Sequence, residues 1–143
     1  MNFFKKKSHP ASTFFSSYTK QEKIITLTLV LIGAFCDDKK LNEDELKFLN
    51  TYIDIFEVSS KEVTHYFETT TSKILFQNML QMDEEKIDNA LYMILSVLKC
   101  DGIVNERKDM LFLGVLEKVG IAPDDYKEKM EKTNALFKFI MNE

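Results

Sequence analysis

Aspartates stand where two predicted helices end, in positions from which they could bind a metal ion. Asp37, Asp38 and Asp101 lie next to unpaired backbone carbonyls, whose partial negative charge makes a carboxylate unfavourable by a few tenths to about 1 kcal/mol. One candidate for compensation is the amino end of the following helix, which offers free amides near Asn42 and Asn105. The other is a bound calcium, magnesium or manganese ion, because carboxylates and carbonyls are the ligands that these cations prefer.

Motifs for other kinds of chemistry are missing from the sequence. The acidic residues do not follow EF-hand spacing, and there is no GxSxG, HExxH or phosphate-binding glycine loop. His9 and His65 have no neighbouring ligand at zinc spacing. Cys36 and Cys100 form no CxxC motif, and we expect both thiols to be buried and reduced. We therefore expect that the protein is not an enzyme.

Size and charge restrict the class of protein. The chain has 143 residues, the size of one domain, and a net charge of −4. We expect no nucleic-acid partner, because binding to phosphates requires a basic surface. The longest uncharged run, residues 24–36, is shorter than the roughly 20 residues that a membrane-spanning helix needs. We expect a cytoplasmic protein with no transmembrane segment.

The first 18 residues differ from the rest of the chain in charge and pattern. They contain lysines but no acidic residue, and their aromatic residues have no helical spacing. They also lack the apolar core and cleavage site of a secretory signal. We predict a flexible basic and aromatic leader over 1–18, whose phenylalanines dock on a helical domain over 19–143. The alternative is a weak contact of this leader with a membrane surface or an acidic partner. The residues concerned are Phe3, Phe4, Lys5, Lys6, Lys7, Phe14 and Phe15.

Helices are predicted along almost the whole domain. No proline lies between Pro10 and Pro123, glycines are few, and apolar residues recur at steps of three and four. The predicted fold class is all-α, a single compact bundle of about seven helices. The first helix is apolar on most sides, which predicts a buried, central position. The helices are expected to cover about 19–37, 42–56, a short segment from 59, 72–82, 83–98, 105–120 and 123–141.

Residues 20–58 repeat after 63 positions as residues 83–121, with six identical pairs. Glu22, Lys23, Ile24, Asp38, Asn42 and Glu43 align with Glu85, Lys86, Ile87, Asp101, Asn105 and Glu106. We interpret the repeat as two helical hairpins, over about 20–58 and 83–121, related by an approximate twofold axis. The hairpins are expected to share one core that contains Ile24, Leu31, Phe35, Ile87, Ile94 and Leu98.

Each repeated unit is a buried helix, an acidic turn and a capped helix, and the turns carry a family pattern. Over about residues 20–130 the chain resembles the tellurite-resistance TerB-like family. Members of that family have Asp-Gly, an aliphatic residue two beyond the glycine, and a glutamate seven after the aspartate. The first copy, FCDDKKLNEDELKFL, keeps Asp38, Leu41 and Glu45 but has Lys39 in place of glycine. The second copy, LKCDGIVNERKDMLFL, keeps Asp101, Gly102 and Val104 but has Lys108 in place of glutamate.

The resemblance implies a cytosolic, non-catalytic binding module of stress-response or membrane-associated systems, with an acidic surface that holds a divalent cation. Carried over to this chain, the metal ligands would come from Asp38, Glu45, Asp101, Asn105 and Glu106. Because Lys108 could itself neutralise Asp101, the two departures from the pattern weigh against such a site.

Three hypotheses follow from these patterns. The leading one is a TerB-like binding module that binds a divalent cation or a basic protein partner at its acidic turns. The second is a protein-interaction adaptor without a metal, in which the exposed apolar side of the last helix contacts another chain. The third is a small metal-dependent enzyme.

Overall fold

The computed structural model describes residues 10–35, 41–102 and 106–141 of the chain. Within these ranges it contains a short 3-10 helix and seven α-helices, and no strand. The predicted all-α fold class is therefore confirmed. The elements are η1 (Pro10–Phe15), α1 (Lys20–Ala34), α2 (Glu43–Phe56), α3 (Ser60–Thr69), α4 (Ser72–Leu80), α5 (Glu84–Lys99), α6 (Glu106–Val119) and α7 (Pro123–Met141).

Local capping chemistry explains where several of these helices begin. Three helices start with a capping box, in which the cap side chain and a glutamate three residues later satisfy each other's backbone amides. Asp83 lies at the N-cap position of α5, but its side chain makes no capping hydrogen bond. Gly120 follows α6 with φ of 79°, the left-handed conformation that glycine adopts readily after a helix. The capping boxes join Thr19 with Glu22, Asn42 with Glu45, and Ser59 with Glu62.

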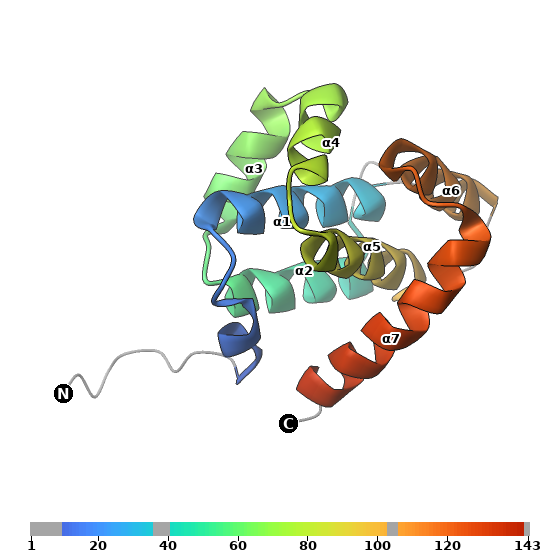
Figure 1. Ribbon diagram of the computed structural model, residues 1–143. Coiled ribbons are helices and arrows are strands. Elements are labelled where there is room, and N and C mark those ends of the chain that lie inside the picture. Colours follow the sequence, from blue (N-terminus) through green and yellow to red (C-terminus); the bar gives the residue numbers. More distant parts are fainter. Residues whose placement is uncertain (1–9, 36–40, 103–105, 142–143) are drawn as a thin grey trace.

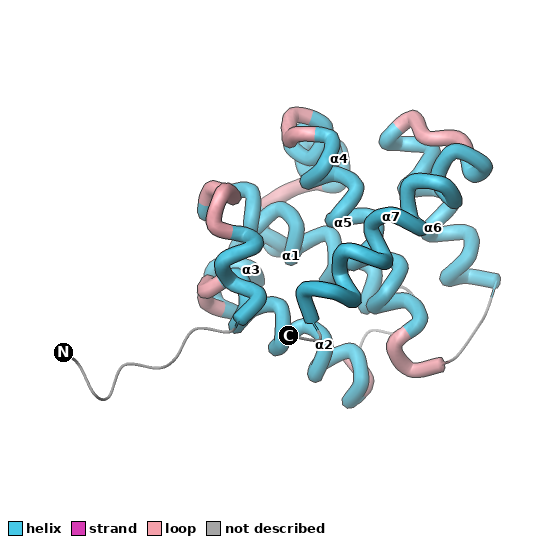
Figure 2. The backbone as a smooth tube through the Cα atoms, turned by 60° about the horizontal axis from the view of Figure 1, so that its bottom comes forward, coloured by secondary structure: helices cyan, strands magenta, loops and turns pink. Residues whose placement is uncertain are grey.

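The pair of helices α1 and α5 forms the centre of the domain, as predicted for α1. In Figure 1, α3 and α4 lie above α1, α2 lies below it, and α6 and α7 lie on the side of α5. Figure 2 shows the same arrangement from another direction, with helices around α1 and α5. Gly33 permits the close approach of the central pair, because a Cβ atom there would lie 3.2 Å from Cγ1 of Val97.

The core is divided into two clusters of buried side chains, one on each side of the central pair. The first joins α1 and α5 to η1, α2, α3 and α7, and the second joins them to α4, α6 and α7. Ile94 and Leu98 belong to the second cluster, whereas Leu31 is half-buried against the first. The expected single core is therefore wrong: α1 and α5 are apolar on opposite sides, so each serves two clusters. The twofold relation between the hairpins stays a prediction.

The segment 10–18 packs against the domain. Phe15 is 1% exposed in the first cluster, between the rings of Tyr18 and Phe56. Ser12 Oγ donates a hydrogen bond of 2.7 Å to the carbonyl oxygen of Ile55. The docking expected for Phe14 and Phe15 is thus observed. Residues 10–18 pack into the same cluster as the helices, so the packing does not separate them from the domain at residue 19. Phe3, Phe4, Lys5, Lys6 and Lys7 lie outside the described residues.

Candidate functional site

The centre of the predicted metal site is Asp101, which follows α5. Its Oδ1 accepts a hydrogen bond from Nζ of Lys108 at 3.0 Å, and its Oδ2 accepts one from Nδ2 of Asn42 at 2.9 Å. The side chains of Asp101 and Lys108 are only 9% and 5% exposed. Asp101 is therefore neutralised by a buried ammonium group, as the lysine in the second turn had suggested.

Asn42 connects this ion pair to the start of α2. Its Oδ1 accepts a hydrogen bond from the backbone N–H of Glu45, and its own N–H donates to Oε1 of Glu45. The remaining amide group, Nδ2, donates to Asp101. One side chain thus caps α2 and joins it to the end of α5, while Lys108 joins the same carboxylate to α6. The three helix ends are connected in a single polar network.

The five predicted ligands have different positions. Glu45 is 5% exposed and takes part in the capping box, and Asp101 takes part in the ion pair. Glu106 is exposed in the first turn of α6. Asp38 and Asn105 lie outside the described residues.

The thiol of Cys100 lies in the electric field of the acidic residues at these helix ends. The thiol is half-buried, and desolvation raises its pKa, followed by the negative charges of Glu45, Asp101 and Asp44. Lys108 acts in the opposite direction on the same thiol. The thiolate is therefore disfavoured. Cys100 is half-buried and not fully buried as we predicted, and Cys36 lies outside the described residues.

The chemistry of these groups does not fit a divalent cation at Asp101. A cation would have to displace or face the ammonium group of Lys108, which already neutralises the carboxylate. In the described parts of the chain, no three histidine, cysteine, aspartate or glutamate side chains are grouped so that they could hold a metal ion. The network around Asp101 is instead suited to linking helices.

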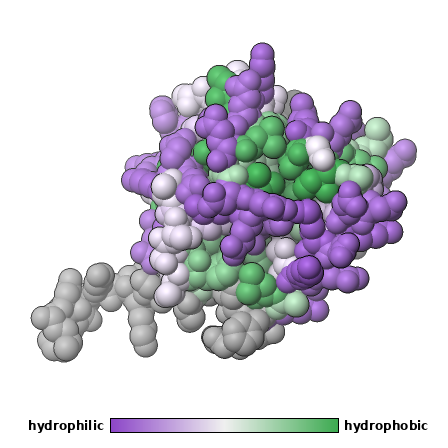
Figure 3. Space-filling model, viewed as in Figure 1, coloured by the Kyte–Doolittle hydropathy of each residue, from purple (hydrophilic) through white to green (hydrophobic). Residues whose placement is uncertain are grey.

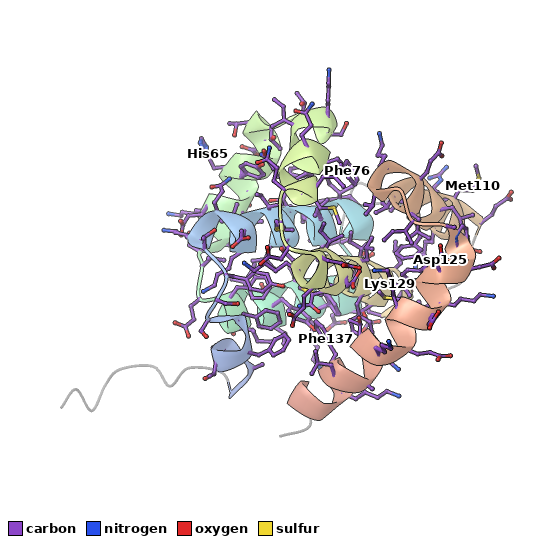
Figure 4. All side chains as sticks on the ribbon, in the orientation of Figure 1. His65, Phe76, Met110, Asp125, Lys129 and Phe137 are labelled. Carbon is purple, nitrogen blue, oxygen red and sulfur yellow. The ribbon has the colours of Figure 1, made fainter. Side chains whose placement is uncertain are left out.

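A second group of charges lies where α7 crosses α5. Lys129 of α7 pairs with Glu84 and, at 3.7 Å, with Asp88 of α5 (Figure 4). Desolvation raises the pKa of Asp88, and its Oδ1 is buried without a hydrogen-bond partner among the described residues. Glu85 and Lys132 line the same small groove of about 380 Å³. This acidic groove was not predicted from the sequence, because its residues come from two helices far apart in the chain.

Most of the described apolar side chains of the last helix are buried. Tyr126, Met130 and Phe137 are 9%, 7% and 3% exposed and pack into the two clusters. Phe137 points from α7 into the domain, where its ring lies 4.5 Å from that of Tyr92 (Figure 4). These three side chains of the expected apolar side are therefore used for the packing of α7 itself, whereas Leu136 is 36% exposed, so an apolar contact through the last helix stays a prediction.

Hydrophobic side chains are exposed on α6 instead. Phe112, Val115 and Leu116 form the buried side of this helix, but Met110 and Leu113 are 64% and 51% exposed. Met110 lies on the outer side of α6 (Figure 4). An ordinary surface helix carries polar residues opposite its buried side, so α6 has an excess of hydrophobic surface.

The exposed side of α6 is accompanied by a hydrophobic area where α4 and α6 meet. Figure 3 shows this area on the face turned to the viewer. Phe76 of α4 is half-buried, with Nζ of Lys118 5.5 Å from the centre of its ring, and Leu80 is 48% exposed. We call Phe76, Leu80, Met110 and Leu113 the α4–α6 surface. Where exposed apolar side chains adjoin one another, they are typical of protein-binding surfaces.

Comparisons with known proteins add no assignment. No protein-family model matches the chain, and no curated protein and no solved structure matches it either. None of the helices in the described ranges combines the length and the apolar character needed to cross a membrane. The resemblance to TerB-like proteins stays a prediction that rests on the residues of the two turns, so function has to be argued from the surface.

Proposed function

We propose that the protein is a non-catalytic, cytoplasmic binding module of the TerB-like kind, which acts as a protein-interaction adaptor. Its contact area is the α4–α6 surface. The observation that carries the proposal is the exposure of two large hydrophobic side chains of α6, because Met110 and Leu113 are more than half exposed although the same helix also buries Phe112 and Leu116.

The polar features of the turns support an adaptor over a cation-binding protein. Asp101 is paired with Lys108, and Glu45 belongs to a capping box, so both acids take part in the internal connections of the fold. Removing either partner of a buried ion pair is strongly destabilising, which gives these residues a structural role without a ligand.

The partner is expected to present apolar side chains that are surrounded by polar residues of its own surface. Met110 suits such a contact, because an unbranched thioether adapts its shape to different surfaces. Lys118 beside Phe76 and the acidic Glu117 of α6 can supply a polar rim around the apolar centre. An amphipathic helix of another protein has this chemistry.

The test compares a double variant of α6 with a single control variant at an exposed leucine of α2. Met110→Ser with Leu113→Ser removes two exposed apolar groups of α6, whereas Leu46→Ser removes from α2 a leucine that is 48% exposed, close to the 51% of Leu113. A partner is first identified by cross-linking in the native cell, then purified, and its affinity is measured by calorimetry. We expect the double variant to weaken binding by at least about thirtyfold, as for loss of about 2 kcal/mol at the centre of an interface.

The Leu46→Ser variant is expected to bind like the natural sequence. Equal affinity of both variants for the purified partner would contradict the α4–α6 surface as the contact area. The non-catalytic proposal would be contradicted if the purified protein converted a substrate and if substitution of one of its polar residues abolished that activity.

A further inference from the structure

The outer side of α6 has an apolar centre between a basic edge and an acidic edge. Met110 is 64% exposed on this side, and Gly114 follows it about one helical turn later (Figure 4). The exposed Arg107 and Lys118, about three turns apart, form the basic edge. The acidic edge, at steps of three and four residues, consists of Glu106, Asp109 and Glu117, with Leu113 between them.

Gly114 stands in the middle of α6, where glycine is a poor helix former. It does not have the positive φ that explains Gly102 and Gly120. At Gly33 of α1 the reason is a close neighbour, because a Cβ atom there would lie 3.2 Å from Cγ1 of Val97. At Gly114, by contrast, no atom of the described residues lies within 4 Å of an added Cβ atom. A second helix that crosses α6 here would supply a reason for the glycine, because the absent side chain lets two backbones come close.

The opposite charges of the two edges make α6 complementary to a parallel copy of itself. When two such helices pack in parallel about a twofold axis, the basic edge of each faces the acidic edge of the other. Arg107 then lies opposite Glu106 of the second copy, and Lys118 lies opposite Glu117 of the second copy. In an antiparallel pair, edges of like charge would face each other, which is unfavourable. Among the described residues, Glu106, Glu117 and Lys118 form no ion pair that would compete with this contact.

We propose that α6 pairs in parallel with α6 of a second copy of this chain, and that the two helices cross at Met110 and Gly114. The proposal rests on the proposed function, because it names an occupant for the α6 part of the α4–α6 surface. Met110 lies at the centre of the contact and Leu113 at its margin. One pair of helices buries less than the roughly 1,200–2,000 Å² of a stable interface, so the dimer is weak. Since both contacts cover Met110, the second copy and another protein partner exclude each other.

The first test measures self-association of the purified full chain by sedimentation equilibrium under reducing conditions. We expect a monomer–dimer equilibrium with a dissociation constant below about 1 mM. Gly114→Gln fills the space at the crossing and should weaken the dimer at least about tenfold. The melting midpoint of this variant, measured where the chain is monomeric, should stay the same or rise, because glutamine forms helices better than glycine. A fall of the midpoint would show that the fold itself needs this glycine, which would contradict its role in the dimer.

The second test exchanges charges between the edges. Lys118→Glu places two acidic residues opposite each other at both ends of the twofold contact and should weaken the dimer at least about fivefold. Adding Glu117→Lys to the same chain restores opposite charges across the interface, so this double variant should recover the natural dissociation constant. The matched control is Lys61→Glu, which makes the same change at an exposed lysine of α3 and should leave the dimer unchanged.

Three further results would overturn the proposal. These are a natural sequence that stays monomeric at about 1 mM, a Gly114→Gln variant that associates as strongly as the natural sequence, or a charge-exchanged double variant that associates no better than Lys118→Glu. Failure of the dimer and failure of the adaptor function are distinguishable. A monomeric chain that loses its partner through Met110→Ser with Leu113→Ser would refute the dimer alone. A dimeric chain whose serine variant still binds the partner would refute the partner contact alone.

Discussion

Nζ of Lys108 lies 3.0 Å from Oδ1 of Asp101, seven residues earlier, and both side chains are withdrawn from solvent. The pair spans the turn between α5 and α6, where the sequence had also suggested a metal ion. Here the positive charge beside the carboxylate is supplied by the chain itself. Two predictions follow from this geometry, one for the lysine and one for added metals.

Replacing Lys108 by methionine should destabilise the fold by about 3–5 kcal/mol, because it leaves the buried carboxylate of Asp101 without its partner charge. The free energy of unfolding is measured by urea titration. Lys47→Met, at an exposed position of α2, is the control and should change stability by less than about 0.5 kcal/mol. Similar losses in both variants would mean that the ion pair contributes little.

Calcium, magnesium, manganese and zinc should leave the melting midpoint of the natural sequence unchanged at millimolar concentration and fixed ionic strength. A specific ion present at about 100 times its dissociation constant would stabilise the fold by roughly 2.7 kcal/mol, which is easily detected. A cation-selective rise that disappears in Asp38→Asn or Asp101→Asn would instead establish a metal site at the turns.

Glu22 and Lys86 predict a pH dependence of stability. Desolvation raises the pKa of Glu22, but hydrogen bonds from Thr19 and Lys86 and the charge of Lys86 outweigh it and hold the pKa below its usual value. Nζ of Lys86 lies 2.9 Å and 3.0 Å from the two carboxylate oxygens. A lowered pKa in the folded state stabilises the fold above the unfolded pKa of about 4.3, and this contribution is lost as the pH falls through the folded value.

The measurement for this pair is the difference in unfolding free energy between the natural sequence and Glu22→Gln from pH 7 to pH 3. We expect a constant advantage of the natural sequence at neutral pH that shrinks below about pH 4.3. An advantage that grows with acidity would have the wrong sign for this ion pair.

Phe15→Ala should cost about 3–5 kcal/mol, the range for removing a buried phenylalanine. The ring of Phe15 is 1% exposed and lies 4.6 Å from that of Phe56. Phe14→Ala, which removes a half-buried ring, should cost clearly less. Denaturant titration of both variants decides whether segment 10–18 belongs to the folded unit; a loss below about 1 kcal/mol for Phe15 would place it outside.

The sequence predicted the helices well because their signals are local. Capping boxes such as Asn42 with Glu45, and the glycine after α6, depend on residues three or four apart. The Lys108 partner could be foreseen for the same reason, since it lies seven residues from Asp101. The hydrogen bond from Asn42 to Asp101 joins residues 59 positions apart, and no local pattern encodes it.

The acidic groove beside α7 and the exposed side of α6 were missed for a related reason. Apolar periodicity identifies a helix face that is suited to burial, but it does not say which faces find a neighbour. The stripe of Tyr126 and Phe137 on α7 is covered, whereas Met110 and Leu113 on α6 are not. Only the packing of helices against each other separates these two outcomes.

The central pair of helices has a consequence for how the domain unfolds. Because α1 and α5 contribute side chains to both clusters, displacing either helix disturbs the packing of both clusters at once. The close approach at Gly33 leaves little freedom for the two helices to slide. Two regions that look like separate cores should therefore melt in one cooperative step, with a single transition in calorimetry and with the slowest amide hydrogen exchange in α1 and α5.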